Sequence, residues 1–170
     1  HDSTRRPYPF DPEAAKRLLA EAGRSSLTLQ LWRSSRPIYA RIAQAIQQDL
    51  AAVGIKAEIR SLAQAEVISA GGAGKAPMIW SGGMAWIADF PDPSNFYGPI
   101  LGCGGAVPGG WNWAKYCNQE IDALTAEADA MAQPDQAQGR MDLWRQIFIK
   151  IMDDAPWAPV SRRSSSTTMA

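Results

Sequence analysis

Apolar residues recur along the first third of the chain with two different periods, one typical of helices and one of strands. Residues 38–53 place isoleucine, leucine or valine at every third or fourth position, which draws one apolar stripe along a helix. On either side, residues 27–31 and 55–60 alternate apolar with polar side chains, as half-buried strands do. A strand, a helix and a strand in so few residues predict a parallel pair with a right-handed crossover. The predicted fold class is therefore α/β, with a mainly parallel sheet flanked by helices.

Capping residues predict a further helix near the amino end. Asp11 is suited to the N-cap, Pro12 to the first helical position and Glu13 to the first turn. Gly23 follows the last apolar residue of that segment and can adopt the left-handed conformation that ends a helix. A helix is therefore expected between Pro12 and Gly23.

The carboxy-terminal third predicts two more helices. Asn118 is a suitable N-cap for the first, and the second is expected to begin near Pro134 and to end before Pro156. Residues 157–160 are compatible with a strand that returns to the sheet. The Ser- and Thr-rich residues 161–170 are expected to form a disordered tail.

The middle of the chain is less regular. Residues 78–80 predict a short buried strand that continues irregularly through residues 84–87. Residues 89–113 hold so many Pro, Gly and Asn residues that we expect a long loop without regular structure, and such loops are usually functional. The glycine-rich residues 71–75 depart from a phosphate-binding loop at their flanks, so they predict a flexible surface turn.

Length and charge narrow the classes of protein. A chain of 170 residues fits one domain, residues 1–170. Its 17 basic residues balance 17 acidic ones without a long run of either sign, which argues against nucleic acid as a partner. No stretch approaches the roughly 20 apolar residues of a membrane span, and the amino end lacks a signal-like apolar core. The domain is expected to be soluble as given, with a signal segment upstream left open.

Candidate catalytic groups are scarce. The one histidine, His1, stands at the amino end, which argues against Ser-His-Asp and Cys-His hydrolases and leaves too few ligands for a zinc or haem site. No cofactor, metal or catalysis is therefore expected. Asp89 and Asp92 could form the acid pair of a hydrolase, which is the rival hypothesis. For Asp92, between two prolines, we favour a turn-forming or helix-capping role.

Asp89 is the more informative of the two acids. Residues 76–114 contain no Lys, Arg or His, so Asp89 and Asp92 carry the formal charges of this aromatic-rich segment. A partly shielded carboxylate beside Trp80 and Trp86 would favour a protonated amine through charge pairing and cation–π contact. Trp86 is accordingly expected to line a pocket. The alternative for Asp89, a cap or a core hydrogen-bonding role, stays open.

The remaining aromatic and sulfur residues mainly suggest structure. Trp144 lies on the apolar face of its helix and is expected in the core. Trp111 and Trp113 fit either a pocket or packing around a disulfide. Cys103 and Cys117 flank a Gly-, Pro- and Trp-rich stretch, which favours a disulfide over two unpaired thiols and hence an oxidising compartment.

Five segments also follow one another in the order found in a known family. They are YPFDPEAAKRLLAEAG (8–23), IAQAIQQDLAAVGIKAEI (42–59), MAWIADFPDPSNF (84–96), WNWAKYCNQEID (111–122) and DAPWAPV (154–160). Together they resemble the peptide- and nickel-type extracytoplasmic solute-binding proteins, the receptors of ABC importers. The resemblance covers nearly the whole chain. It departs at residues 64–76, which run to Ala and Gly where relatives have a better-defined helix.

The resemblance implies a type II periplasmic-binding-protein fold, in which two lobes close around a ligand by a hinge. This chain resembles the carboxy-terminal lobe, so an amino-terminal lobe is expected to be missing. The implied partners are a small-molecule or peptide ligand and the ABC permease subunits in the membrane. The implied location is periplasmic or extracellular, with or without a lipid anchor.

The resemblance also assigns site residues. In peptide-binding relatives the acid of a Trp-x-x-Asp pattern holds the amino terminus of the ligand, and here the pattern falls on Trp86 and Asp89. The expected ligand contacts further include Trp80, Met84 and Ala85, although many relatives have glycine where Ala85 stands.

The function implied by the residues and the resemblance together is binding without catalysis, of short peptides or another amine-bearing solute. Receptors of this family for nickel chelates, oligosaccharides, glutathione or opines are the alternatives. The family often has cysteines at the positions of Cys103 and Cys117, which supports the disulfide. A structural or protein-docking domain is the third hypothesis.

Overall fold

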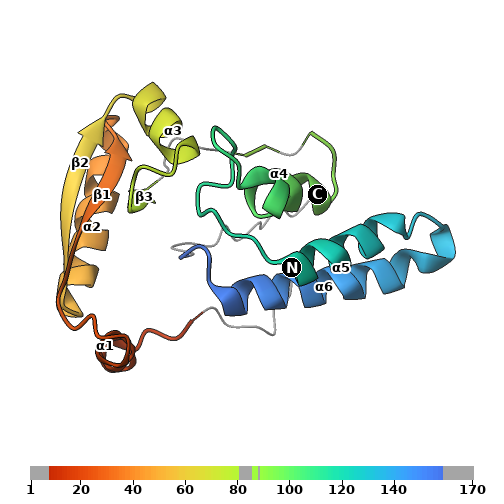
Figure 1. Ribbon diagram of the computed structural model, residues 1–170, viewed down its shortest axis with the longest axis horizontal. Coiled ribbons are helices and arrows are strands. Elements are labelled where there is room, and N and C mark those ends of the chain that lie inside the picture. The colour runs from red at the N-terminus through yellow and green to blue at the C-terminus, as the bar shows by residue number, and fades with distance from the viewer. Residues whose placement is uncertain (1–7, 81–85, 88, 159–170) are drawn as a thin grey trace, which may run out of the picture.

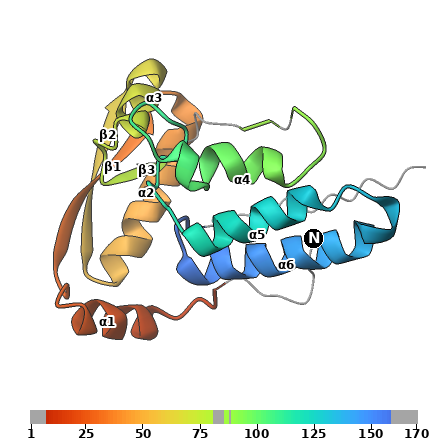
Figure 2. The ribbon, with the colours of Figure 1, turned by 45° about the vertical axis from the view of Figure 1, so that its right-hand side comes forward.

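The structure is a computed structural model that describes residues 8–80, 86–87 and 89–158. A small sheet with its helices lies on one side of the molecule, and a second group of helices lies on the other (Figures 1 and 2). The predicted tail, residues 161–170, lies outside the described residues.

The sheet consists of parallel strands in the order β2-β1-β3. Strand β1 spans Leu27–Ser34, β2 spans Ile55–Leu62 and β3 spans Met78–Trp80. In the register of the sheet, Leu31 of β1 lies between Ile59 of β2 and Met78 of β3. The predicted α/β class and parallel pairing are confirmed.

Helices α1 (Pro12–Glu21) and α2 (Pro37–Ala52) begin and end as their sequence predicts. The Asp11 carboxylate caps α1 by accepting a hydrogen bond from the Ala14 backbone N–H at 2.8 Å. Between α2 and β2, Gly54 has a φ of +92°, and a Cβ there would lie 2.8 Å from the Ser25 carbonyl oxygen. Only glycine therefore fits this tight connection.

The predicted surface turn at residues 71–75 is wrong in its first part. Residues Gln64–Gly72 form helix α3, and Gly71 and Gly72 are buried at its end. A Cβ on Gly71 would lie 2.5 Å from the Trp113 ring. Glycine disfavours helices by about 1 kcal/mol, but here the missing side chain allows the close contact that holds the helix.

The long loop predicted at residues 89–113 is also partly wrong. It contains helix α4 (Ser94–Ile100) and a short 3₁₀ turn, η1 (Cys103–Gly105). Helix α4 includes a glycine and a proline, so its sequence gives little signal. It forms because Tyr97 packs into the helical core, and Ile100 of the same helix is buried as well.

The last helices form an antiparallel pair. Helix α5 spans Gln119–Ala130 and is capped by Asn118, and α6 spans Ala137–Asp154 after the short 3₁₀ turn η2 (Pro134–Gln136). Both predicted helices are confirmed. Of the strand predicted at residues 157–160, Trp157 and Ala158 are described and lie in no strand, and the other residues lie outside the described part.

Buried apolar side chains form two clusters in the described part of the chain. Leu31, Ala43 and Ala57 join the sheet to α2. The second cluster lies between α4, α5 and α6, and it includes Trp144, which is 3% exposed as predicted. The sheet side and the helical side are linked at the end of α3, where the Gly72 carbonyl accepts hydrogen bonds from Gly109 N and Lys115 Nζ.

Candidate functional site

The predicted site residues begin at the last residue of β3 and follow that strand in the chain. In open parallel sheets, ligands bind outside the carboxyl ends of the strands. Strand β3 ends at Trp80, whose backbone pairs with Arg33 of β1. Met84 and Ala85 lie outside the described residues, so their expected ligand contacts stay predictions. Trp86 and Asp89 are described, and they come together.

Asp89 and Trp86 meet at a third residue, Asn95. The Asp89 backbone N–H donates to Asn95 Oδ1 at 3.0 Å, and the Trp86 indole N–H donates to the same oxygen at 3.3 Å. The Asn95 amide donates in turn to Asp89 Oδ2 at 3.4 Å. The Asp89 side chain is exposed, and no Lys or Arg of the described residues forms an ion pair with it. Its carboxylate is thus held in place and left open to solvent.

Sequence reasoning missed Asn95. It stands six residues after Asp89 in a stretch expected to be irregular, and nothing in its spacing points to the acid. The first turn of α4 carries it to Asp89, and that helix was itself unpredicted.

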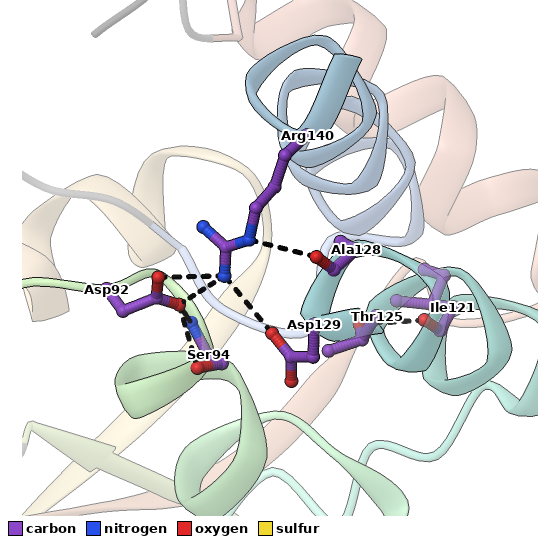
Figure 3. A network of polar contacts seen from close by, with 7 residues as sticks. All are labelled: Asp92, Ser94, Ile121, Thr125, Ala128, Asp129 and Arg140. Carbon is purple, nitrogen blue, oxygen red and sulfur yellow. Dashed lines mark hydrogen bonds and ion pairs between the residues drawn. The ribbon is translucent and has the colours of Figure 1, made fainter. Parts of the chain in front are cut away.

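Asp92, the other acid of the segment, is part of a polar network with α5 and α6 (Figure 3). Arg140 Nη2 lies 2.7 Å from Asp92 Oδ2 and 3.2 Å from Asp129 Oδ1, and Arg140 Nε donates to the Ala128 carbonyl. Asp92 Oδ1 also accepts hydrogen bonds from the backbone N–H and the hydroxyl of Ser94. The predicted turn-forming role of Asp92 is confirmed.

This network changes the interpretation of charge around the site. The sequence showed no cation in residues 76–114, but Arg140 reaches Asp92 from α6, 48 residues away in sequence. Asp92 is therefore compensated, whereas Asp89 has no cationic partner among the described residues. Of the two acids in the hydrolase hypothesis, Asp92 is bound to Arg140 and to Ser94 at the start of α4.

The charge of Asp92 is expected to make stability depend on pH. Burial by itself would raise the Asp92 pKa, but hydrogen bonds from Arg140 and Ser94 outweigh it and lower the pKa below 3.8. A lowered pKa in the folded state means that the carboxylate stabilises the fold above about pH 4 and that this contribution is lost as the pH falls below that value.

Asp92→Asn is therefore expected to lower the free energy of unfolding by about 1 kcal/mol at neutral pH and by less near pH 3. Denaturant titrations at both pH values measure the difference. Asp135→Asn, which changes an exposed acid on η2, is the control. An equal cost of Asp92→Asn at both pH values would contradict the role given to its charge.

Indole rings extend from Trp86 to the end of α3. Trp86 meets Trp111 edge to face at 6.1 Å between centroids, and Trp111 stacks on Trp113 at 6.2 Å. Trp113 lies against Gly71 of α3. Trp111 remains 41% exposed. The sequence left open whether Trp111 and Trp113 line a pocket or pack inside the fold. Trp113 packs against α3, and Trp111 presents an exposed indole next to Trp86.

Cys103 and Cys117 form the predicted disulfide. Asn112, which is fully buried, fills the closed loop by donating to the carbonyls of Gly102 and Tyr116 at 3.0 and 2.7 Å. The Asn112 side chain therefore ties the two ends of the disulfide-closed loop together.

The Asp122 carboxylate fastens this region to α5. It accepts hydrogen bonds from the Cys103 backbone N–H and from the Tyr97 hydroxyl, the latter at 2.5 Å. Burial, and then the neighbouring Asp122, raise the pKa of the Tyr97 hydroxyl. Tyr97 therefore stays protonated and serves as a donor that holds α4 in place.

A cationic residue that sequence analysis did not single out stands at the carboxyl end of β1. Arg33 donates from Nη1 to the Ser34 carbonyl at 2.8 Å, and its buried Nε has no hydrogen-bond partner in the described part of the chain. Its spacing in the sequence held no signal for a site, because only the pairing of β1 with β3 brings Arg33 next to the end of β3.

Other kinds of site find no support in the described residues. No three His, Cys, Asp or Glu side chains among them group as a metal ion would need. Nor does any helix in residues 8–80, 86–87 and 89–158 combine the length and the apolar character required to cross a bilayer.

Comparison with known proteins places these observations in a family. The profile of the bacterial extracellular solute-binding proteins, family 5 (middle region), matches residues 1–107. The di/tripeptide-binding protein 4 of Pseudomonas aeruginosa is 35% identical over 159 residues, which cover 91% of this chain and 28% of that protein. Heme-binding protein A of Haemophilus influenzae is 34% identical over 160 residues, again 91% of this chain and 28% of the relative. The chain thus spans less than a third of the length of either relative.

A solved structure has the same fold. The ABC transporter-associated periplasmic binding protein DppA from Helicobacter pylori, in complex with the peptide STSA, superposes with a TM-score of 0.82 at 26% identity. The match covers 94% of this chain and 30% of that one. The predicted type II periplasmic-binding-protein fold is confirmed.

Proposed function

Because this chain belongs to family 5 of the bacterial extracellular solute-binding proteins, we propose that it is one lobe of a receptor that binds a short peptide for an ABC importer. The ligand lies between this lobe and an amino-terminal lobe, and hinge closure presents the loaded receptor to the permease. The observation that carries the proposal is the exposed carboxylate of Asp89, fixed beside the Trp86 indole and free of any described cation.

The chemistry of this arrangement suits the amino terminus of a peptide. A protonated amine can donate charge-assisted hydrogen bonds to the Asp89 carboxylate and lie against the Trp86 ring. Two of the similar proteins support a peptide ligand, since one is named for di- and tripeptides and the other was solved with a bound peptide.

We further propose that the receptor releases its ligand chemically unchanged. Acid–base hydrolysis through carboxyls needs two of them free to act together, and Asp92 is bound to Arg140. The receptor works outside the cytoplasm, in the periplasm or held at the membrane surface by a lipid. The Cys103–Cys117 disulfide supports that location, because disulfides persist in oxidising compartments.

Calorimetric titration of the whole receptor with a panel of dipeptides tests the proposal. Saturable binding of one ligand per receptor is expected, and mass spectrometry of the denatured complex should return the dipeptide intact. Haemin belongs in the panel because one relative is named for haem. Nickel–histidine belongs there because nickel chelates are an alternative ligand class. Binding of either of these without any dipeptide would overturn the peptide assignment, and cleaved products would overturn the absence of catalysis.

A further inference from the structure

Asn95 joins Asp89 to Trp86 by hydrogen bonds. It is 7% exposed and lies in the first turn of α4. Its side chain caps neither end of that helix and instead reaches back to the preceding segment. There Oδ1 accepts from the Asp89 backbone and the Trp86 indole, and Nδ2 donates to the Asp89 carboxylate.

The amide group matches these partners by its chemistry. One oxygen accepts from two N–H groups while the nitrogen donates to a carboxylate, and an amide offers this combination in one planar group. An aspartate here would place a second carboxylate against Asp89, and a leucine would leave the Trp86 and Asp89 N–H groups without an acceptor. The side chain therefore fixes Asp89 and Trp86 relative to each other.

From this geometry we infer that Asn95 is a positioning residue of the amine site, which sets the Asp89 carboxylate and the Trp86 indole for a protonated amine. The inference rests on the proposed function. Binding that needs no rearrangement of the site costs less free energy than binding that does, so a fixed carboxylate holds the amine more tightly than a mobile one.

The rest of the structure holds Asn95 itself in place. The Asn95 backbone N–H donates to the Asp92 carbonyl at 3.1 Å, and the Asp92 carboxylate is bound to Arg140 of α6 (Figure 3). Two residues further along, the buried Tyr97 donates to Asp122 of α5. Helix α4 is thus anchored to both helices of the antiparallel pair, and the amine site inherits that rigidity through Asn95.

The test compares affinities for a dipeptide and for its N-acetylated form, which lacks the charged amine, in the whole receptor. The dissociation constant of the acetylated dipeptide divided by that of the free dipeptide measures selectivity for the charged amine. Asn95→Leu is expected to reduce this ratio about 2- to 10-fold, the range for loss of a hydrogen bond. Phe96→Leu is the control on the same helix, because it changes a side chain that is 39% exposed and leaves the hydrogen bonds of Asn95 and Tyr97 in place. It should keep the ratio.

A folded Asn95→Leu receptor that keeps the wild-type ratio would overturn the inference. Should circular dichroism show that this variant does not fold, Asn95→Asp decides, because it keeps the size of the side chain. It sets two carboxylates side by side, which disfavours ionisation of both. Asp92, the other acid of the segment, is already paired with Arg140.

Dipeptide affinity of Asn95→Asp is therefore expected to rise between about pH 5 and about pH 7, while that of the wild type stays flat. Equal profiles for the two proteins would overturn the role of Asn95. A wild-type receptor that binds the free and the acetylated dipeptide equally would instead overturn the proposed amine site, which separates the two failures.

Discussion

Replacement of Cys103 and Cys117 by serine is expected to lower the free energy of unfolding of the receptor by about 3 kcal/mol. The cysteines are 14 residues apart, and closing a loop of about 15 residues restricts the unfolded chain by roughly this amount. Denaturant unfolding of wild type and variant measures the loss. Dithiothreitol supplies the control, because it should destabilise the wild type and leave the variant unchanged. A wild type that is equally stable with and without the reductant would contradict the expectation.

Asp89→Asn is expected to weaken dipeptide binding by about 1.5 to 3 kcal/mol, or about 10- to 150-fold, the range for hydrogen bonds that involve a charged group. Asparagine keeps the shape of the side chain and removes the charge that pairs with the amine. The fold should be unaffected, because the Asp89 side chain is exposed and its backbone bond to Asn95 remains. Asp135→Asn is the control, since it removes an exposed carboxylate from η2.

Local patterns were sufficient to predict the regular parts of the fold. The alternation in β1 and β2 and the apolar stripe of α2 act within the segments themselves, and these elements form where expected. Helix α1 likewise begins at the cap that Asp11 supplies.

The helices that depend on contacts between residues far apart in the sequence were not predicted. Helix α4 is held by Tyr97 in the helical core and by Asp92, whose partner Arg140 lies on α6. Helix α3 ends in glycines that pack against Trp113. In both helices tertiary packing outweighs local propensity, and a sequence read segment by segment does not contain that information.

The candidate site shows the same limit. The placement of Asp89 next to Trp86 followed from a short pattern in the sequence, and the turn-forming role of Asp92 followed from its flanking prolines. The residue that joins Asp89 to Trp86, Asn95, could not be found this way, because its hydrogen bonds depend on how α4 docks. Whether these residues contact a ligand is the proposal to be tested.

Calorimetry with a dipeptide and its N-acetylated form, on wild type and Asp89→Asn, is the most direct measurement. If the Asp89 carboxylate binds the ligand's protonated amine, acetylation should weaken binding to the wild type by about tenfold or more and have little further effect on the variant. An equal loss on acetylation in both receptors would show that the amine is held elsewhere and would contradict the account.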